Sequence, residues 1–268
     1  MDANKPLHTS AAGDACGPEE SNTTASAAKA AAARLAEIRL VVVGWRWPGK
    51  SLTGNTIIGR EEFHLERAAE FCIKRETEVD GREISVVDTP GWFSTQDTPP
   101  SYKQELVKGP SLCPPGPHAF LLVIPVGMFT EVDRSRIEEH LSLFGERVWN
   151  HTIVVFTWAE VLRKISIERY IRREGQELQW VLRKCKKRYF VINNSIFGEN
   201  PQVGSLMEKV EKMVSEEGGH YSVEAEAKAL DENQNAAGEA QALQGAQQKP
   251  SPEQDVSNAM GVLSLSTE

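Results

Sequence analysis

Short apolar runs alternate with amphipathic segments along the central part of the chain. The apolar runs predict strands at 38–43, 119–126, 152–156 and 189–192. The first run is almost continuously apolar, as expected of a strand that is buried on both faces. Apolar residues at helical spacing predict helices at 50–58, 102–108, 132–144, 167–182 and 203–214.

A turn signal interrupts this alternation once. Asp80 and Gly81 separate a charged segment at 66–80 from a partly apolar run at 82–88. The preferred two-residue hairpin turn requires positive φ at both central positions, and an Asp-Gly pair tolerates this. We therefore predict an antiparallel pair here. The whole pattern predicts a three-layer α/β fold with a mostly parallel sheet and one antiparallel hairpin strand.

Both ends of the chain differ in composition from this central part. Residues 1–36 are rich in Ala and Ser, and residues 219–268 are acidic and rich in Ala and Gln. Large apolar side chains are scarce in both segments, so neither buries enough surface to offset the conformational entropy of the chain. We expect two disordered tails around a single domain at 37–218.

Charge and cysteine content narrow the functional class. The net charge of −8 does not favour binding to nucleic acid, which requires a basic surface. The four cysteines lack pairing or zinc spacing, and no apolar signal region opens the chain, which favours a cytoplasmic protein with free thiols. No run approaches the ~18 apolar residues of a membrane span, so we expect no transmembrane segment.

The strongest motif follows the first predicted strand. Gly44 is separated by four residues from Gly49, Lys50 and Ser51, and a predicted helix begins there. This is the spacing and context of a phosphate-binding loop, whose backbone N–H groups and helix start surround a polyphosphate. In such a loop Lys50 reaches the β- and γ-phosphates, and the Ser51 hydroxyl binds Mg²⁺.

A second motif, from Asp88 to Gly91, follows the hairpin strand. Alone it is also compatible with an ordinary turn, because the Asp-x-Pro-Gly pattern is common. Beside a phosphate loop, Asp88 is placed to hold Mg²⁺ and the Gly91 N–H to meet the γ-phosphate. Gly44, Asp88, Thr157 and Asn193 all follow predicted strand ends, where α/β folds bind ligands.

With further residues in the same order, these motifs resemble the GTPases of immunity-associated proteins (GIMAP, or immunity-associated nucleotide-binding proteins). The resemblance spans about residues 38–214. It rests on Gly44, Gly49 to Ser51, Thr53 to Arg60, Glu62-Phe63, Val86 to Gly91, Pro115 to Ala119, Phe144 to Arg147, Trp149, Val155 to Thr157 and Asn193-Asn194.

The resemblance implies a G domain related to septin and Toc GTPases. Such a domain binds the guanine nucleotides GTP and GDP with Mg²⁺ and self-associates in a nucleotide-dependent way, as a homo- or hetero-oligomer. Ser51 and Asp88 are the implied metal ligands. The implied nucleotide-binding residues are Gly44, Trp45, Arg46, Trp47, Pro48, Gly49, Lys50, Ser51, Leu52, Asp88, Gly91, Thr157, Trp158, Glu160, Asn193 and Asn194.

The base-recognition loop departs from the family pattern. Glu160 stands where the family generally has Asp, and its extra methylene moves the carboxylate by ~1.5 Å. We expect a weaker but surviving preference for guanine. Trp158 replaces a polar residue, and two roles are open for it: stacking on the base, or packing the loop.

The groups for hydrolysis also differ. Pro48 has no N–H to offer a phosphate. The family often has a Thr shortly before the position of Cys72 to complete the Mg²⁺ shell, and Ala68 to Phe71 stand there instead. Trp92 rather than Gln follows Gly91. Arg46 is either an arginine finger in cis or, the interpretation we favour, an arginine stacked on Trp45 or Trp47.

His118 is a weak candidate to act on the γ-phosphate, and a structural histidine is the favoured alternative. The sequence therefore predicts a GTP-binding regulatory protein with slow or partner-stimulated hydrolysis. The alternative is a non-hydrolysing G-domain assembly module that binds nucleotide weakly.

Overall fold

The computed structural model describes residues 34–46, 49–94, 96–195, 198, 200–226 and 228. Most of the two predicted tails, together with Trp47, Pro48 and Thr95, lies outside these residues. The fold is described below from Leu35 onward.

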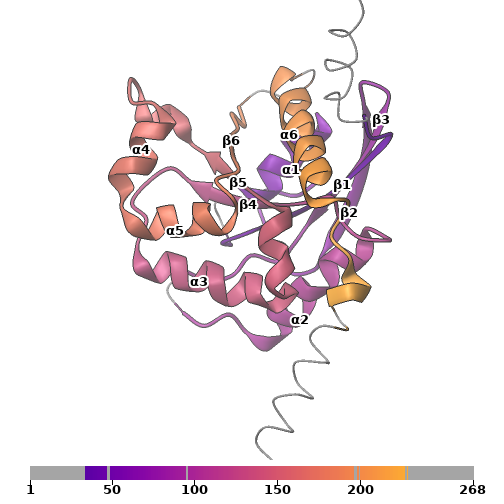
Figure 1. Cartoon of the computed structure of the whole chain (residues 1–268), viewed down its shortest axis with the longest axis horizontal. Coiled ribbons are helices and arrows are strands. Elements are labelled where there is room, and N and C mark those ends of the chain that lie inside the picture. The colour runs from indigo at the N-terminus through magenta and orange to yellow at the C-terminus, as the bar shows by residue number, and fades with distance from the viewer. Residues whose placement is uncertain are drawn as a thin grey trace, which may run out of the picture. The chain divides into compact units, whose positions relative to one another are not determined.

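Six strands form one sheet in the order β2-β3-β1-β4-β5-β6 (Figure 1). Every neighbouring pair is parallel except β2 and β3. The strands β1, β4 and β5 are mostly apolar, because both of their faces are covered. The strands are β1 (Glu37–Gly44), β2 (Ile73–Val79), β3 (Arg82–Asp88), β4 (Ala119–Pro125), β5 (Thr152–Thr157) and β6 (Tyr189–Val191).

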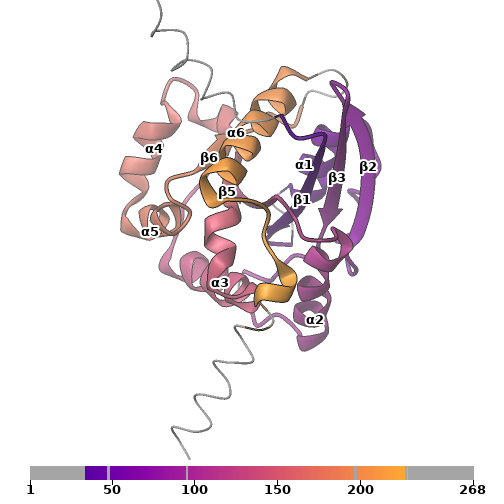
Figure 2. The same ribbon diagram turned by 45° about the vertical axis from the view of Figure 1, so that its right-hand side comes forward.

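Helices cover both faces of the sheet, which confirms the three-layer prediction (Figure 2). Apolar residues of α1 and α6 share one core layer with β1, β4 and β5, and those of α2, α3 and α5 form the other. The α-helices are α1 (Lys50–Ile58), α2 (Pro100–Lys108), α3 (Glu131–Leu141), α4 (Ile167–Glu174), α5 (Gln176–Lys184) and α6 (Pro201–Glu217). Short 3₁₀ helices occupy Gly109–Leu112, Ser142–Phe144, Glu146–His151 and Ala159–Leu162.

The predicted hairpin is present. β2 and β3 are antiparallel in the register Val79↔Arg82 to Ile73↔Asp88. Asp80 and Gly81 have φ values of +52° and +71°, as the turn requires. However, β2 begins at Ile73, and the preceding residues of the charged segment are not part of the sheet.

The single helix predicted at 167–182 is wrong. Gly175, with φ +101° and ψ −170°, separates α4 from α5. Glycine adopts this backbone conformation without a Cβ clash, so the helix ends although the apolar spacing continues. Glu174, the last residue of α4, accepts a 2.5 Å hydrogen bond from the Phe129 N–H.

Packing continues beyond residue 218, where we expected the domain to end. Tyr221 is 4% exposed, and its hydroxyl donates a 2.5 Å hydrogen bond to the carbonyl of Phe144. Its N–H donates to the carbonyl of Pro117 at 2.9 Å. Residues 223–226 are helical, and Glu226 is buried. We name residues 219–226 the C-terminal strap.

Candidate functional site

The phosphate-loop motif connects β1 to α1. The loop leaves the strand at Gly44 (φ +151°) and enters the helix at Gly49 (φ +87°). A Cβ at Gly44 would lie 2.8 Å from the carbonyl oxygen of Val123 on the neighbouring strand, so the loop starts where only glycine fits. Gly49 lies close to Thr157 and Asn194, which come from the ends of two other strands.

The ammonium of Lys50 folds back over this loop. Its Nζ donates a 3.1 Å hydrogen bond to the carbonyl of Trp45, and the side chain is buried. Burial lowers the pKa of Lys50; Asp88 opposes this effect and Arg46 adds to it. A buried cation with one hydrogen bond keeps donor capacity for an anion at the loop.

Ser51 and Asp88 form a pair of oxygen ligands beside that cation. The Ser51 hydroxyl donates a 2.5 Å hydrogen bond to Oδ2 of Asp88. Burial raises the pKa of Asp88, while Lys50 and the Ser51 hydrogen bond oppose the rise. Oδ1 of Asp88 is buried and has no hydrogen-bond partner among the described residues. A hydroxyl and a carboxylate with spare lone pairs suit Mg²⁺, which prefers oxygen ligands and keeps several from water or substrate.

The segment after Asp88 is joined to the loop by main-chain hydrogen bonds. The Arg46 N–H donates to the Trp92 carbonyl at 2.8 Å, and the Trp92 N–H donates to the Gly44 carbonyl at 3.3 Å. Gly91, the residue before Trp92, packs directly on the loop: an added Cβ would lie 2.4 Å from Cα of Arg46. The two motifs are therefore in direct contact, and glycine at 91 is a steric requirement.

Asn194 ties the segment after β6 to α1. Its Oδ1 accepts a 2.9 Å hydrogen bond from the Thr56 hydroxyl, and its Nδ2 donates to Oγ1 of Thr53 at 3.1 Å. Asn193 is held by its N–H, which donates to Oε1 of Gln202 at 2.7 Å. Asn194 thus positions the helix that carries Lys50 and Ser51.

The predicted base-recognition residues begin at the last residue of β5 and continue after it. Thr157 is buried, and its carbonyl accepts a hydrogen bond from the Val126 N–H at 2.9 Å. Trp158 has φ +58° and is 48% exposed, and Glu160 lies exposed in the next 3₁₀ helix. Trp158 borders the loop, whereas Glu160 lines none of the cavities around it in the described residues.

The segment before β2 lies over the loop. Leu65, Arg67, Ala68 and Ala69 line a cavity of about 180 Å³ together with Arg46, Gly49, Lys50, Ser51, Leu52 and Trp158. Residues of the same segment line an adjoining space of about 460 Å³ that reaches Asp88. We had placed this segment in a strand, since its alternating charges resemble one. Arg67, which lines both spaces, adds a cation near the site.

The guanidinium of Arg46 faces aromatic rings. Its Cζ lies 5.1 Å from the centre of the Phe93 ring and 5.9 Å from that of Tyr102. The stacking expected for this arginine is present, but Phe93 and Tyr102 take the place we assigned to Trp45 or Trp47. Trp92 is 1% exposed and stacks on His140 at 4.8 Å.

His118 lies away from the site. It precedes β4, at the edge of the sheet opposite the phosphate loop, and its Nδ1 accepts a 3.0 Å hydrogen bond from the Arg39 N–H. Burial lowers the pKa of His118 to about 4, and Arg39 and His220 add to this effect. Within one chain, His118 therefore does not reach the groups around Lys50.

This geometry coincides with a family match. The model of the AIG1 family matches residues 38–241. The chain belongs to the AIG1 family. The match agrees with the resemblance drawn from the motifs and includes the C-terminal strap.

Known relatives share a limited part of their length with this chain. "GTPase IMAP family member 8" of Homo sapiens is 28% identical over 200 residues, which is 72% of this chain and 29% of that protein. "Immune-associated nucleotide-binding protein 5" of Arabidopsis thaliana is 34% identical over 187 residues, covering 67% of this chain and 62% of the relative. The chain thus spans less than two thirds of either relative.

A solved structure shows the same fold. Toc33 from Arabidopsis thaliana, crystallised with Mg²⁺ and GMPPNP, superposes with a TM-score of 0.55 at 18% identity, over 68% of this chain and 86% of Toc33. The chain therefore has a G-domain fold. Among the described residues, no helix is both long and apolar enough to cross a membrane.

Proposed function

We propose that this chain binds GTP and GDP with Mg²⁺ at the carboxyl edge of its sheet and acts as a guanine-nucleotide-dependent regulatory protein. The observation that carries the proposal is the pairing of Ser51 with Asp88 beside the buried ammonium of Lys50. Membership of the AIG1 family and the Mg²⁺–GMPPNP complex of a Toc33 with the same fold support it.

Each group has a distinct task in this proposal. Lys50 supplies positive charge to the phosphates, while Ser51 and Asp88 hold Mg²⁺. Loop N–H groups and the start of α1 add a preorganised anion site. The Gly91 N–H meets the terminal phosphate, and Glu160 accepts hydrogen bonds from the base after a shift of its loop.

Hydrolysis is proposed to be slow, or to depend on a partner. Trp92 occupies the position after Gly91, is almost fully buried and has no acceptor atom with which to orient a water molecule. Arg46 is engaged by Phe93 and Tyr102, so it acts on phosphate only after leaving these rings. Hydrolysis therefore requires a water-orienting group other than Trp92 and a movement of Arg46 away from Phe93 and Tyr102. Binding of a partner would provide both.

Nucleotide-dependent self-association, as a homo- or hetero-oligomer, is the second part of the proposal. Several large apolar side chains are exposed: Met128 is 87% exposed, Val132 56%, Trp158 48% and Val161 59%. Trp158 lines the cavity over the phosphate loop, and its carbonyl accepts a 3.1 Å hydrogen bond from the Val161 N–H. Exposed apolar side chains beside a binding site are typical of protein interfaces. The free thiols of Cys72, Cys113 and Cys185 support a cytoplasmic location.

One observation favours a different function. Glu160 is exposed and carries an additional methylene, which weakens base recognition. A G domain with poor base recognition and no water-orienting group would serve as a non-hydrolysing assembly module.

Isothermal titration of the full chain with GDP, a non-hydrolysable GTP analogue and ATP, each with Mg²⁺, separates these functions. We expect binding of both guanine nucleotides, and its loss in Lys50→Ala. Lys212→Ala, at a side chain that is 77% exposed, is the matched control and retains binding. Absence of heat with every nucleotide would refute the first function and leave the assembly module. A phosphate-release assay then measures turnover.

A further inference from the structure

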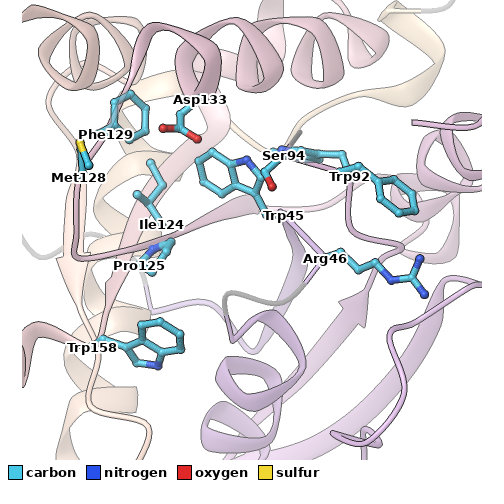
Figure 3. A pocket seen from close by; sticks show the side chains of 11 residues that line it. Trp45, Arg46, Trp92, Ser94, Ile124, Pro125, Met128, Phe129, Asp133 and Trp158 are labelled. Atoms are coloured by element: carbon cyan, nitrogen blue, oxygen red, sulfur yellow. The ribbon is translucent and has the colours of Figure 1, made fainter. Parts of the chain in front are cut away.

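A second cavity lies beside the phosphate loop, and the proposed function leaves it unused. It has a volume of about 570 Å³ and is bounded by the segment after Gly91, the end of β4 and the start of α3 (Figure 3). This volume is within the range of sites for small organic ligands. Most of the wall is apolar or aromatic and includes Trp45, Phe93, Ile124, Pro125, Met128 and Phe129.

The cavity is distinct from the space of about 180 Å³ over the phosphate loop. Only Arg46 and Trp158 line both, while Lys50 and Ser51 line only the smaller one. A molecule in the larger cavity therefore leaves the phosphate-binding groups accessible.

One carboxylate points into the larger cavity. Figure 3 shows Asp133, in the first turn of α3, directed toward the rings of Trp45 and Phe129. Its Oδ2 accepts hydrogen bonds from the N–H and the hydroxyl of Thr130, at 2.8 and 2.7 Å, and its Oδ1 accepts none from the described residues. Asp133 is half-buried and forms no ion pair within the described part of the chain. This carboxylate therefore keeps both lone pairs and negative charge for a ligand.

A second carboxylate makes this end of the cavity more negative. Oε1 of Glu174 accepts a 2.5 Å hydrogen bond from the Phe129 N–H, and among the described residues Glu174 also has no ion pair. Burial raises the pKa of Tyr170, and Glu174 and Asp133 add to the rise, so both carboxylates act on the same region. Arg134, which follows Asp133 in the chain, is already paired with one glutamate of α3 and one of α5.

The other charged residue of the wall, Arg46, belongs to the phosphate side. Its Cζ lies 5.1 Å from the ring centre of Phe93 and 5.9 Å from that of Tyr102, and Figure 3 shows its guanidinium directed away from Asp133. Burial lowers the pKa of Lys50, and Arg46 adds to this effect, which places the charge of Arg46 near the phosphate loop. The end of the cavity at Asp133 therefore favours a cation.

We propose that this cavity binds an amphipathic organic cation of the arylalkylammonium class, whose ammonium donates a hydrogen bond to Asp133 and whose ring packs against Trp158. Figure 3 shows Ile124 and Pro125 between these two residues, so an apolar wall connects the two contacts. Trp158 is 48% exposed, which leaves much of its indole accessible. A hydrogen bond between an ammonium and a carboxylate is stronger than one between neutral groups, and aromatic rings beside the ammonium add attraction.

Tryptamine and its uncharged isostere tryptophol test this proposal. At pH 7 tryptamine is a cation, because alkylamines have pKa values of ~10. Isothermal titration into the nucleotide-free full chain should show one site for tryptamine and at least ~5-fold weaker binding of tryptophol. Added salt should reduce this difference. Equal affinities of the two compounds, or no binding of tryptamine, would overturn the proposal. Because the titration contains no nucleotide, its outcome is independent of the proposed nucleotide binding.

Two variants assign the two contacts. Asp133→Asn keeps an oxygen acceptor for the Thr130 N–H but removes the charge, so tryptamine should bind ~5- to 10-fold more weakly while tryptophol is unaffected. Trp158→Ala removes the ring, so both compounds should bind ~3- to 10-fold more weakly.

Matched control variants lie outside the cavity. Glu131→Gln removes an exposed charge from the same helix end as Asp133, and Val161→Asn removes an exposed apolar side chain. Neither should change the affinity for either compound, and circular dichroism verifies that each variant is folded. Unchanged tryptamine affinity in a folded Asp133→Asn or Trp158→Ala chain would overturn the proposal, as would an equal loss in the matched control.

Discussion

The Ser51 hydroxyl donates a 2.5 Å hydrogen bond to Oδ2 of Asp88 and so joins the first turn of α1 to the end of β3. Both oxygens lie next to the buried ammonium of Lys50, whose charge stabilises the ionised form of Asp88. This contact brings the two motifs together before any ligand is bound.

Ser51→Ala tests the contact in two ways. The buried carboxylate of Asp88 loses a donor, so the free energy of unfolding should fall by ~1–3 kcal/mol. Because the hydroxyl is also the proposed Mg²⁺ ligand, nucleotide affinity should lose most of its dependence on Mg²⁺. Denaturant unfolding and titrations with and without Mg²⁺ measure both effects. Ser205→Ala, on the exposed side of α6, is the control. An unaltered Mg²⁺ dependence would exclude Ser51 as a ligand.

Gly91→Ala should destabilise the contact between the loop and the segment after Asp88. The new Cβ would lie 2.4 Å from Cα and 2.6 Å from N of Arg46, both main-chain atoms. The backbone must then shift, and we expect a loss of ~2–4 kcal/mol in unfolding free energy together with weaker nucleotide binding. Gly127→Ala, where an added Cβ meets nothing within 4 Å, should be nearly neutral in the same assay. Equal stability of the two variants would contradict the packing described here.

The elements that could be predicted from the sequence are those determined by residues adjacent in the chain. The Asp80-Gly81 turn and the strand ends are determined by a few adjacent residues. The turn lies where it was predicted, and the ends of β1, β4, β5 and β6 lie within one residue of the predicted ends. The ends of β1, β3 and β5 meet at one edge because parallel strands share a direction.

The features that were missed depend on partners distant in the sequence. The pairing of Arg46 with Phe93 and Tyr102 bridges two segments whose proximity follows from the fold alone. Tyr221 is buried and hydrogen-bonded to the carbonyls of Phe144 and Pro117, which lie far away in the sequence. The composition around Tyr221 does not predict these contacts. Gly175 is present in the sequence as a possible helix break. We predicted one continuous helix because the helical spacing of apolar residues continues on both sides of this glycine.

Glu160→Asp should sharpen base selectivity. Shortening the side chain by one methylene retracts the carboxylate by ~1.5 Å to the length usual in the family. If Glu160 recognises guanine, affinity for GTP should rise relative to ATP by ~5- to 150-fold, corresponding to ~1–3 kcal/mol. Competition titrations of the wild type and the variant give this ratio. Glu168→Asp, at an exposed position on α4, is the control. A ratio that does not change would mean that another group reads the base.

Acid should weaken the fold through histidines beneath the C-terminal strap. Burial lowers the pKa of both His118 and His151 to about 4. Their rings lie 6.2 Å from His220 and 6.0 Å from Tyr221, respectively. His118 faces the cation of Arg39, and His151 faces Arg188 and Lys186 with Glu217 opposing them.

The direction of the effect follows from proton binding. Between pH 6.5 and 4 the unfolded chain takes up protons on these histidines while the folded chain does not, so stability falls as pH falls. Each histidine contributes up to ~1.4 kcal/mol per pH unit across this window. His118→Asn keeps an acceptor for the Arg39 N–H but removes the titrating group, so unfolding curves at several pH values should show a shallower acid slope. His64→Asn, at an exposed position, should leave the slope unchanged. The same slope in all three proteins would show that His118 titrates alike in the folded and unfolded chain.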